Sequence, residues 1–444
     1  MKKAYFIGIG GIGMSALARY FKSKKWLVSG SDRVRSSITD MLQKEAIRVK
    51  IGHKKASITR GLALVVYNRA ITRSSPGYGE VAAARRLGVP TLPYAEVLGG
   101  ITKEYMTVAI TGSHGKSTTT ALAGLALMKA RLDPTILIGT NLRELGGRNI
   151  RIGRGPHLVL EADDFGAAFT RYSPAVAIIT NIDREHLDFY KTFANLKNAF
   201  LKFLSQTRKG GAFILNRDDK VLFSLRARIA AIAKKNGIRI RWYSLRDPEA
   251  KSIKRALRIP GAHNVSNALA VYALGRELNI PPRTVLASLH GYQGAWRRME
   301  RRGAFHGAPV FDDYAHHPTE IKATLAAFRE KYPEKKVLCV FQPHQAKRLA
   351  ALFGEFSEAF DDADEVLMLP IYKVAGRDER PGRFDSEALV RLVQKKHPEK
   401  LFFYLADPKN LRKAVLALKG PLSSKVILMM GAGSIVDLTD SLLS

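Results

Sequence analysis

The stretch Thr107-Val108-Ala109-Ile110-Thr111-Gly112-Ser113-His114-Gly115-Lys116-Ser117 decides the fold of this chain. Its first five residues predict a buried strand, and a helical segment through about Met128 follows the glycines. A glycine-rich turn between a strand and a helix lets backbone N–H groups surround a phosphate. In such a loop Lys116 would reach the β and γ phosphates of ATP, and the Ser117 hydroxyl would coordinate Mg²⁺.

This phosphate loop departs from the usual spacing at one position. The pattern Gly-x-x-x-x-Gly-Lys-Ser/Thr requires a glycine at position 110, where this chain has Ile110. The sequence therefore predicts a variant loop. The residues expected to bind ATP there are Gly112, Ser113, His114, Gly115, Lys116, Ser117 and Thr118.

A second glycine turn, Gly8-Ile9-Gly10-Gly11-Ile12-Gly13, follows an expected strand and opens the helical run Met14–Phe21. Glycines allow a diphosphate to approach the backbone, and the helix N-terminus favours its negative charge. Asp32 ends the next expected strand, where an NAD site would hold its ribose. The turn predicts a ligand that contains a diphosphate and leaves its identity open.

Strand-length apolar runs alternate with helical segments throughout the 444 residues, which predicts an α/β fold with parallel sheets. The expected strands are Tyr5–Gly8, Leu64–Tyr67, Thr107–Thr111, Leu158–Glu161, Val176–Asn181, Val337–Gln342 and Val426–Met430. Polar stretches at Gly99–Glu104 and Arg297–Gly303 suggest boundaries. We expect three domains, over residues 1–103, 104–299 and 300–444.

The net charge of +33 is the unusual feature of the composition and by itself suggests a nucleic-acid partner. Residues 1–103 carry +14, residues 104–299 carry +17 and residues 300–444 carry +2. The basic residues are scattered singly and in pairs, without the long block expected of a dedicated nucleic-acid surface. This distribution favours small anionic ligands and no specific nucleic acid.

The single cysteine, Cys339, lies inside an apolar run and is expected to pack as a small core residue. No stretch of 18 uninterrupted apolar residues occurs, so we expect no membrane insertion. The early glycines interrupt the only segment that resembles a signal peptide. The sequence predicts a cytoplasmic protein.

Candidate metal ligands follow two expected strands of the central segment. Glu161 ends one strand and begins Glu161-Ala162-Asp163-Asp164, and His186 lies shortly after the other, in Asn181–His186. The carboxyl ends of parallel strands meet at one edge of a sheet, and Mg²⁺ prefers oxygen ligands. Glu161 is therefore the candidate for a first metal ion, and His186 is the candidate for a second.

The last third of the chain has its own polar cluster, Asp312-Asp313-Tyr314-Ala315-His316-His317. A zinc site is one interpretation of its carboxylates and imidazoles, but no further ligand follows at an i, i+4 spacing. Contacts to a charged substrate or nucleotide are favoured. Arg348, just after another expected strand, suits a clamp for a carboxylate or phosphate.

Taken in this order, these motifs resemble the Mur ligase family, and within it the alanine-adding branch. The resemblance rests on Gly8–Gly13 with Gly30-Ser31-Asp32, Thr111–Thr120, Glu161-Ala162-Asp163, Thr180–His186, Gly261-Ala262-His263-Asn264, Arg297-Arg298, Asp312–Glu320, Phe341–Arg348 and Gly431-Ala432-Gly433. It implies a Rossmann-like domain for a UDP-sugar, a central ATPase-type domain, and a Rossmann-like domain for an amino acid. The implied activity is ATP-dependent joining of L-alanine to the lactyl carboxylate of UDP-N-acetylmuramate through an acyl phosphate, a cytoplasmic step of peptidoglycan synthesis.

The resemblance also assigns roles to residues. Lys116 would bind phosphates, Ser117 and Glu161 the first Mg²⁺, and His186 the second. Asn264 and Asn267 would lie near the adenine. The residues implied for the substrates are Gly10, Gly11, Ile12, Asp32, Arg297, His316, His317 and Arg348.

Two departures from the family pattern affect this assignment. Gln345 stands where the branch often has Arg, and Gly166 stands where relatives are often acidic. A tripeptide-recycling ligase or a ligase for another amino acid stays open, as do an NAD-dependent oxidoreductase and a basic nucleic-acid-binding protein. The sequence is compatible with a monomer or a homodimer.

Overall fold

The computed structural model describes residues 1–373 and 384–444, which form three sheets. The chain divides into two compact units, one of residues 1–256 and 266–291 and one of residues 257–265 and 292–444. The first unit contains two sheets and the second contains one. Each sheet lies within one of the three expected segments of the sequence.

The first sheet has five parallel strands in the order β3-β2-β1-β4-β5. Its strands are β1 (Lys3–Ile7), β2 (Leu27–Asp32), β3 (Arg48–Ile51), β4 (Leu64–Tyr67) and β5 (Thr91–Pro93). Its helices are α1 (Ile12–Ser23), α2 (Ser37–Lys44), the 3₁₀ turn η1 (Lys55–Ser57), α3 (Tyr78–Arg86) and α4 (Tyr94–Glu104). The strand order reverses at β1, with β2 and β3 on one side of it and β4 and β5 on the other. In such sheets ligands bind outside the carboxyl ends of the strands at the point of reversal.

The second sheet has seven strands in the order β12-β11-β10-β6-β9-β7-β8, and only β8 is antiparallel to its neighbour. Its strands are β6 (Met106–Thr111), β7 (Thr135–Leu142), β8 (Arg148–Arg151), β9 (His157–Glu161), β10 (Val176–Ile179), β11 (Ala212–Asn216) and β12 (Arg239–Tyr243). Helix α5 (Lys116–Lys129) follows the phosphate loop. The expected strands Thr107–Thr111 and Leu158–Glu161 each begin one residue earlier than predicted, and the expected Val176–Asn181 ends earlier, at Ile179.

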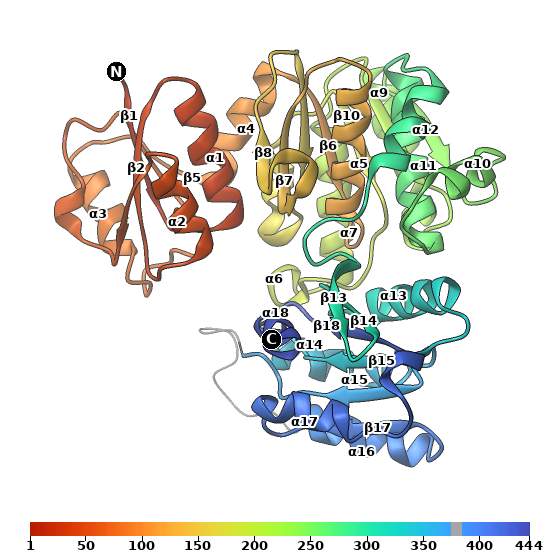
Figure 1. Ribbon diagram of the computed structural model, residues 1–444. Coiled ribbons are helices and arrows are strands. Elements are labelled where there is room, and N and C mark those ends of the chain that lie inside the picture. Colours follow the sequence, from red (N-terminus) through yellow and green to blue (C-terminus); the bar gives the residue numbers. More distant parts are fainter. Residues whose placement is uncertain (374–383) are drawn as a thin grey trace. The chain divides into compact units, whose positions relative to one another are not determined.

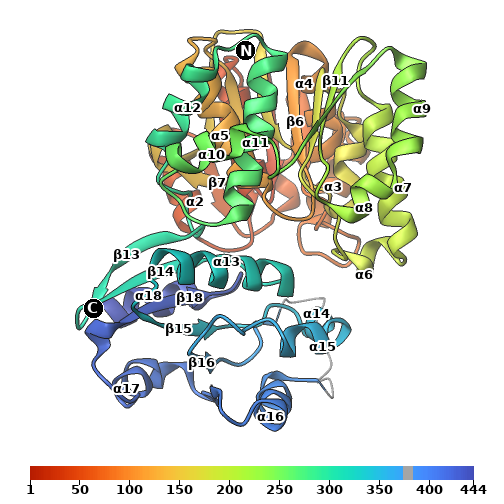
Figure 2. The ribbon, with the colours of Figure 1, turned by 90° about the vertical axis from the view of Figure 1, so that its right-hand side faces the viewer.

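Helices cover both faces of this sheet. Figure 2 shows α5, α11 (Ala262–Glu277) and α12 (Pro282–Gly291) on one side, and α7 (Phe193–Ser205) and α9 (Arg226–Asn236) on the other. The remaining short elements are η2 (Arg143–Leu145), η3 (Phe165–Arg171), α6 (Leu187–Tyr190), α8 (Lys220–Ser224) and α10 (Glu249–Ala256). Burial on both faces explains why the central strands are nearly continuous apolar runs.

The third sheet has six strands in the order β13-β14-β18-β15-β16-β17, and β13 is antiparallel to β14. Its strands are β13 (Glu300–Phe305), β14 (Ala308–Asp313), β15 (Lys336–Phe341), β16 (Glu365–Met368), β17 (Leu401–Tyr404) and β18 (Lys425–Met430). Its helices are α13 (Pro318–Lys331), α14 (Ala346–Ala351), α15 (Phe353–Ser357), α16 (Ser386–Lys396), η4 (Pro408–Asn410), α17 (Leu411–Leu416), η5 (Leu422–Ser424) and α18 (Ile435–Leu443). Figure 1 shows this sheet in blue and blue-green.

The structure confirms one simpler expectation, the packing of the single cysteine. Cys339 is fully buried in β15, and burial raises the pKa of its thiol, as expected for a packing residue. None of the helices in the described part of the chain has the length and apolarity needed to cross a membrane.

One buried ion pair fixes the third sheet. Lys425 at the start of β18 and Glu365 at the start of β16 flank the central strand β15 and are 0% and 2% exposed. The Lys425 Nζ donates to both carboxylate oxygens of Glu365, at 2.7 and 2.6 Å. Removing one member of such a pair leaves a buried charge without compensation.

We predict that Lys425→Met lowers the free energy of unfolding of the second unit by about 3–5 kcal/mol. The double variant Lys425→Met/Glu365→Leu should recover most of that loss, because it removes both charges. Calorimetric unfolding of the full chain measures both effects. A double variant as unstable as the single one would contradict the prediction.

Candidate functional site

The phosphate loop between β6 and α5 has a backbone that only glycine fits at two positions. Gly112 has φ of 143° and Gly115 has φ of 80°. A Cβ at Gly112 would lie 2.0 Å from the Thr180 Oγ1, and one at Gly115 would lie 2.4 Å from the Asn267 Oδ1. Helix α11 and the end of β10 therefore press directly on the loop.

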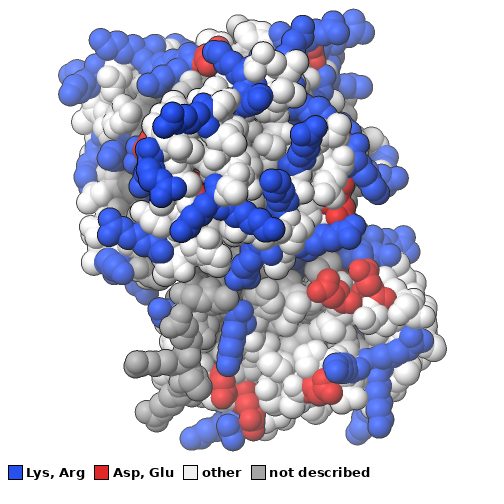
Figure 3. Space-filling view, turned by 90° about the vertical axis from the view of Figure 1, so that its left-hand side faces the viewer, with Lys and Arg blue, Asp and Glu red and all other residues white. Residues whose placement is uncertain are grey.

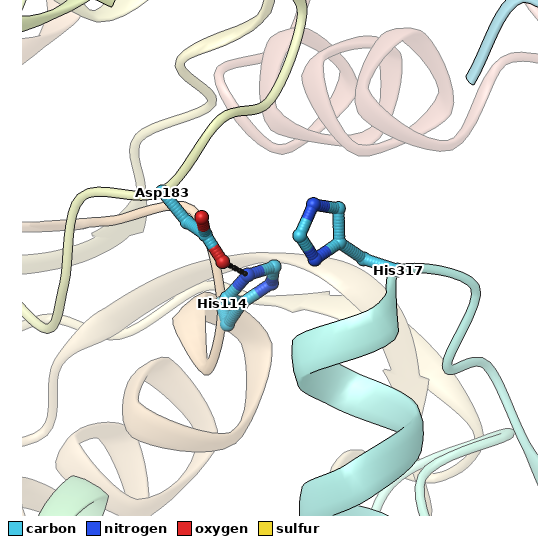
Figure 4. A group of neighbouring side chains, drawn as sticks. All are labelled: His114, Asp183 and His317. Atoms are coloured by element: carbon cyan, nitrogen blue, oxygen red, sulfur yellow. Dashed lines mark hydrogen bonds and ion pairs between the residues drawn. The ribbon is translucent and has the colours of Figure 1, made fainter. Parts of the chain in front are cut away.

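The chain after β10 holds the phosphate loop by hydrogen bonds. The Thr180 hydroxyl donates to the His114 carbonyl at 2.6 Å, and the His114 amide donates to the Asn181 Oδ1 at 2.8 Å. The Asp183 amide donates to the Ser113 Oγ at 2.8 Å. In Figure 4 the imidazole of His114 meets the carboxylate of Asp183, with 2.9 Å between Nε2 and Oδ2. These four contacts hold the loop against the chain that follows β10.

Lys116 lies at the centre of this loop. Its Nζ donates to the carbonyls of Gly112 and Ser113, at 2.7 and 3.1 Å, and to the Asp164 Oδ1 at 2.8 Å. Burial acts to lower the pKa of Lys116, but the charges of Asp164 and Asp163 outweigh it and hold that pKa above its ordinary value. Lys116 is therefore a permanent positive charge in the loop.

The oxygen atoms around the loop fit a magnesium ion. The Ser117 hydroxyl donates to the Glu161 Oε1 at 3.0 Å, and the Glu161 Oε2 accepts the Gly139 amide at 2.7 Å. Asp164 is fully buried, and its Oδ2 lacks a hydrogen-bond partner among the described residues. A buried carboxylate oxygen without a donor is suited to a cation.

A second group of potential metal ligands lies beside the first. Asp163, Asp164 and His186 each offer a ligand atom, and these atoms all lie within 4.8 Å of one another. The structure thus places His186 beside two carboxylates, and its ring also contacts Phe165, with 5.1 Å between the centroids. The sequence led to Glu161 as a predicted ligand and not to Asp163 or Asp164. Their position directly after the same strand could have indicated that they also lie at the site.

The glycine turn after β1 is shaped by the end of β2. The amides of Gly8 and Ile9 donate to the Ser31 carbonyl, at 2.8 and 3.0 Å. The Gly10 amide donates to the Asp32 Oδ2 at 2.8 Å. Asp32 therefore holds the turn itself, a role that its distance along the sequence did not suggest.

The first unit joins this turn to the central sheet. The Asn149 side chain in β8 donates to the Ile12 carbonyl at 2.5 Å and accepts from the Arg19 Nη1 at 2.9 Å, so it ties α1 to the second sheet. Tyr94 at the start of α4 lies against Gly13, where a Cβ would be 2.9 Å from its hydroxyl. Burial raises the pKa of Tyr94, and the charges of Asp163 and Glu161 raise it further.

The second unit contains the other predicted contacts. The His316 amide donates to the Glu320 Oε2 at 3.0 Å, and the His317 Nδ1 accepts the Thr319 amide at 3.3 Å at the start of α13. The Arg348 Nη1 donates to the His344 carbonyl at 3.1 Å. These residues follow β14 and β15, which are both neighbours of β18.

Aromatic rings connect these segments of the second unit. The rings of Tyr314 and His316 are 5.2 Å apart, those of His316 and His344 5.8 Å, and those of His344 and Tyr372 5.5 Å and nearly parallel. Gln345 has φ of 70°, and its amide donates to the Tyr372 carbonyl at 3.2 Å. The ring series brings His316 and Arg348 to the same edge of the sheet.

The carboxylates of the polar cluster are engaged in packing. Asp312 accepts from the Thr439 hydroxyl at 2.5 Å and pairs with Arg302. Asp313 accepts the amides of Met299 and Ala315, at 2.8 and 2.9 Å. Burial raises the pKa of both carboxyl groups. These contacts explain the two aspartates without a zinc ion.

Three other predicted residues have structural partners. Arg297 is 6% exposed, and its guanidinium donates to the carbonyls of Gly431 and Gly433, so it anchors the loop after β18. Asn267 lies against the phosphate loop in the first unit. Asn264 belongs to the second unit, where its Nδ2 donates to the Pro260 carbonyl at 2.6 Å.

A variant phosphate loop with oxygen ligands at the strand ends, beside a Rossmann-like sheet with its own glycine turn, defines a class of α/β nucleotide-dependent enzymes. Three family models match the chain: "Mur ligase family, catalytic domain" over residues 3–106, "Mur ligase middle domain" over 110–275, and "Mur ligase, glutamate ligase domain" over 297–433. The chain belongs to the Mur ligase family, whose members are ATP-dependent ligases.

Individual relatives cover nearly the whole chain. A protein of Clostridium kluyveri named UDP-N-acetylmuramate--L-alanine ligase is 38% identical over 89% of this chain and 88% of its own length. A protein of the same name from Caldicellulosiruptor bescii is 37% identical over 100% of this chain and 98% of its own. The structure of UDP-N-acetylmuramate-alanine ligase from Thermotoga maritima matches with a TM-score of 0.79 and 26% identity, over 100% of this chain and 98% of that one.

We predict that Gly115→Ala weakens ATP binding by about tenfold or more, because a Cβ both strains the left-handed backbone and displaces Asn267. Titration calorimetry with ATP measures this. Gly210→Ala is the matched control, since Gly210 has φ of 73° and open space around its Cβ position. Equal affinities of the two variants would contradict the prediction.

Proposed function

We propose that this chain joins L-alanine to the lactyl carboxylate of UDP-N-acetylmuramate with ATP as the energy source. The observation that carries the proposal is the phosphate loop. In it the Lys116 ammonium donates to the Gly112 carbonyl, and the Ser117 hydroxyl donates to Glu161. It occurs in a chain 37–38% identical, over most of its length, to relatives that bear the name of this reaction. The proposal assigns the UDP-sugar to a domain of residues 1–103, ATP to one of residues 104–299 and the amino acid to one of residues 300–444.

The first step activates the carboxylate. A carboxylate oxygen attacks the γ phosphorus, the bond to the β-phosphate oxygen breaks, and an acyl phosphate and ADP result. In the proposal the loop from Gly112 to Thr118 binds the phosphates through the Lys116 ammonium and the amides that are not bonded to Asn181. Lys116 exchanges its contact with Asp164 for one with the transferring group. Asn267 supports the loop, and Asn264 is assigned to the nucleotide.

Magnesium ions belong to this proposal through the donor atoms described above. Ser117 and Glu161 would hold the first ion, and His186, with Asp163 and Asp164, the second. Bound Mg²⁺ supplies positive charge to the phosphate oxygens. The role of the chain is to keep these oxygen atoms within reach of the loop.

The UDP-sugar is assigned to the first sheet. Gly10, Gly11 and Ile12 would receive the diphosphate at the start of α1, where backbone N–H groups and the helix dipole favour an anion. Asp32 supports the turn through the Gly10 amide. The Gly10 amide is bonded to Asp32 and the Gly11 amide to the Gly8 carbonyl, so the amides of the first turn of α1, from Ile12 on, are the donors assigned to the diphosphate.

The second step forms the amide bond. The neutral amino group of alanine attacks the acyl carbon, the bond to the phosphate oxygen breaks, inorganic phosphate leaves, and the nitrogen releases a proton. We assign the amino acid to the second unit, with His316, His317 and Arg348 as its contacts and Arg297 as support for the adjacent glycine loop. Because Gln345 is uncharged, Arg348 is the proposed partner of the alanine carboxylate.

The competing functions explain less. An NAD-dependent oxidoreductase would use the glycine turn and leave the phosphate loop without a role. A nucleic-acid-binding protein would use the charge and neither loop. A ligase for another amino acid or for a tripeptide would use the same two loops, so the assay must compare acceptors.

We predict phosphate release only when UDP-N-acetylmuramate, ATP and L-alanine are all present, with L-serine, glycine and a tripeptide as much poorer acceptors. Lys116→Ala should abolish this release and leave binding of the UDP-sugar intact, because the two ligands use different loops. A colorimetric phosphate assay and calorimetry measure the two properties. Absence of phosphate release with L-alanine would refute the proposed function.

We predict that Glu161→Ala raises the Mg²⁺ concentration needed for half-maximal activity by at least about tenfold, because it removes a carboxylate next to Ser117. Glu104→Ala, an exposed position at the end of α4, is the control. The measurement is a Mg²⁺ titration at saturating ATP. An unchanged titration curve for Glu161→Ala would remove Glu161 from the metal site.

A further inference from the structure

Arg69 follows β4 at the edge of the first sheet where the glycine turn lies. Its neighbour Asn68 packs on that turn, with its Nδ2 3.4 Å from the Cβ position of Gly11. The Asn68 amide donates to the Ile7 carbonyl at 3.3 Å, which fixes the start of the loop. Arg69 is therefore attached to the wall of the proposed diphosphate site.

The side chain of Arg69 extends from this wall to the central sheet. Its guanidinium lies over the ring of Phe189, 4.5 Å from the centroid. A Cβ added to Gly166 would lie 2.3 Å from the Arg69 Nη1, so the guanidinium occupies the space that the missing side chain leaves. Gly166 is two residues from Asp164, and Phe189 is three residues from His186.

The guanidinium still has donors for a ligand. No carboxylate whose side chain the structure describes forms an ion pair with Arg69, and the residue is exposed. The ring of Phe189 contacts the guanidinium, and Gly166 gives it room. A guanidinium held in this way keeps N–H edges that match a carboxylate in a bidentate geometry.

Tyr190 lies close to both Asp164 and Arg69. The Tyr190 hydroxyl donates to the Asp164 carbonyl. Burial raises the pKa of Tyr190, the charge of Asp164 adds to the rise, and the charge of Arg69 opposes it. Arg69 thus brings a positive charge close to the carboxylates proposed to hold metal ions.

We propose that Arg69 binds the lactyl carboxylate of the UDP-sugar, the group that accepts the phosphoryl. This rests on the proposed function. The substrate must extend from the diphosphate at Gly10–Ile12 to the phosphoryl group over Lys116, and Arg69 starts at the first site and ends near the second. Its charge would offset the repulsion between carboxylate and phosphate, and Gly166 is the residue that leaves room for it.

The test compares two ligands that differ at the carboxylate. UDP-N-acetylglucosamine lacks the lactyl group and keeps the diphosphate. Arg69→Gln should weaken binding of UDP-N-acetylmuramate by about 10- to 100-fold and change binding of UDP-N-acetylglucosamine by less than about twofold. Arg60 is an exposed arginine between η1 and β4, and Arg60→Gln should change the binding of neither ligand. Equal weakening of both ligands, or no weakening of either, would overturn the proposal.

A second variant tests the space at Gly166 with Arg69 unchanged. Gly166→Ala should displace the guanidinium and weaken UDP-N-acetylmuramate selectively, in the same direction as Arg69→Gln. Gly237→Ala controls for backbone strain, because Gly237 has φ of 61°, close to the 65° of Gly166, and open space around it. A Gly166→Ala protein that binds both ligands normally would contradict the assignment. Phosphate release by the unchanged protein tests the proposed function separately.

Discussion

The fit between a glycine backbone and the elements pressed against it is the constraint on which the rest of the site depends. At Gly112 and Gly115 the loop touches Thr180 and Asn267 so closely that no side chain fits. Hydrogen bonds between the loop and the residues from Thr180 to Asp183 hold the loop against the end of β10. Lys116, Ser117 and Glu161 can only meet because this loop lies at the carboxyl end of β6, next to β9 and β10. A change in the packing of the central sheet would therefore move the residues proposed to bind the phosphates.

The charge of the chain has a narrower meaning than its size suggests. Figure 3, which views the first sheet from outside, shows lysines and arginines spread over this face with few acidic residues between them. The segments over residues 1–103 and 104–299 carry nearly all of the excess, and these are the segments proposed to bind the UDP-sugar and ATP. A positive field attracts such ligands and raises their rate of association. Few of the basic residues belong to the site itself.

Much of the fold could be predicted, because apolar runs and glycine turns in the sequence mark the individual strands and helices. The expected strand Leu64–Tyr67 matches β4 in both bounds, and the expected strands around the loops differ by one or two residues. The structure has Ser117 hydrogen-bonded to Glu161, and His186 beside Asp163 and Asp164, while the metal-binding roles of these residues stay predictions. Asp32 was different. Its position suited a ribose contact, but its carboxylate accepts a loop amide, and only the approach of β2 to the turn could show this.

The sequence by itself determined the elements, the two glycine loops and the family, because strand periodicity and loop spacing are local properties of the chain. Tertiary structure alone decided which distant residues share a site. The contact of Arg69 with Gly166 and Phe189 joins three segments that no spacing rule connects. The burial of Asp164 beside Lys116 depends on where the chain between β9 and η3 places that carboxylate. Such contacts follow from the packing of whole sheets and helices, where each side chain occupies space left by another.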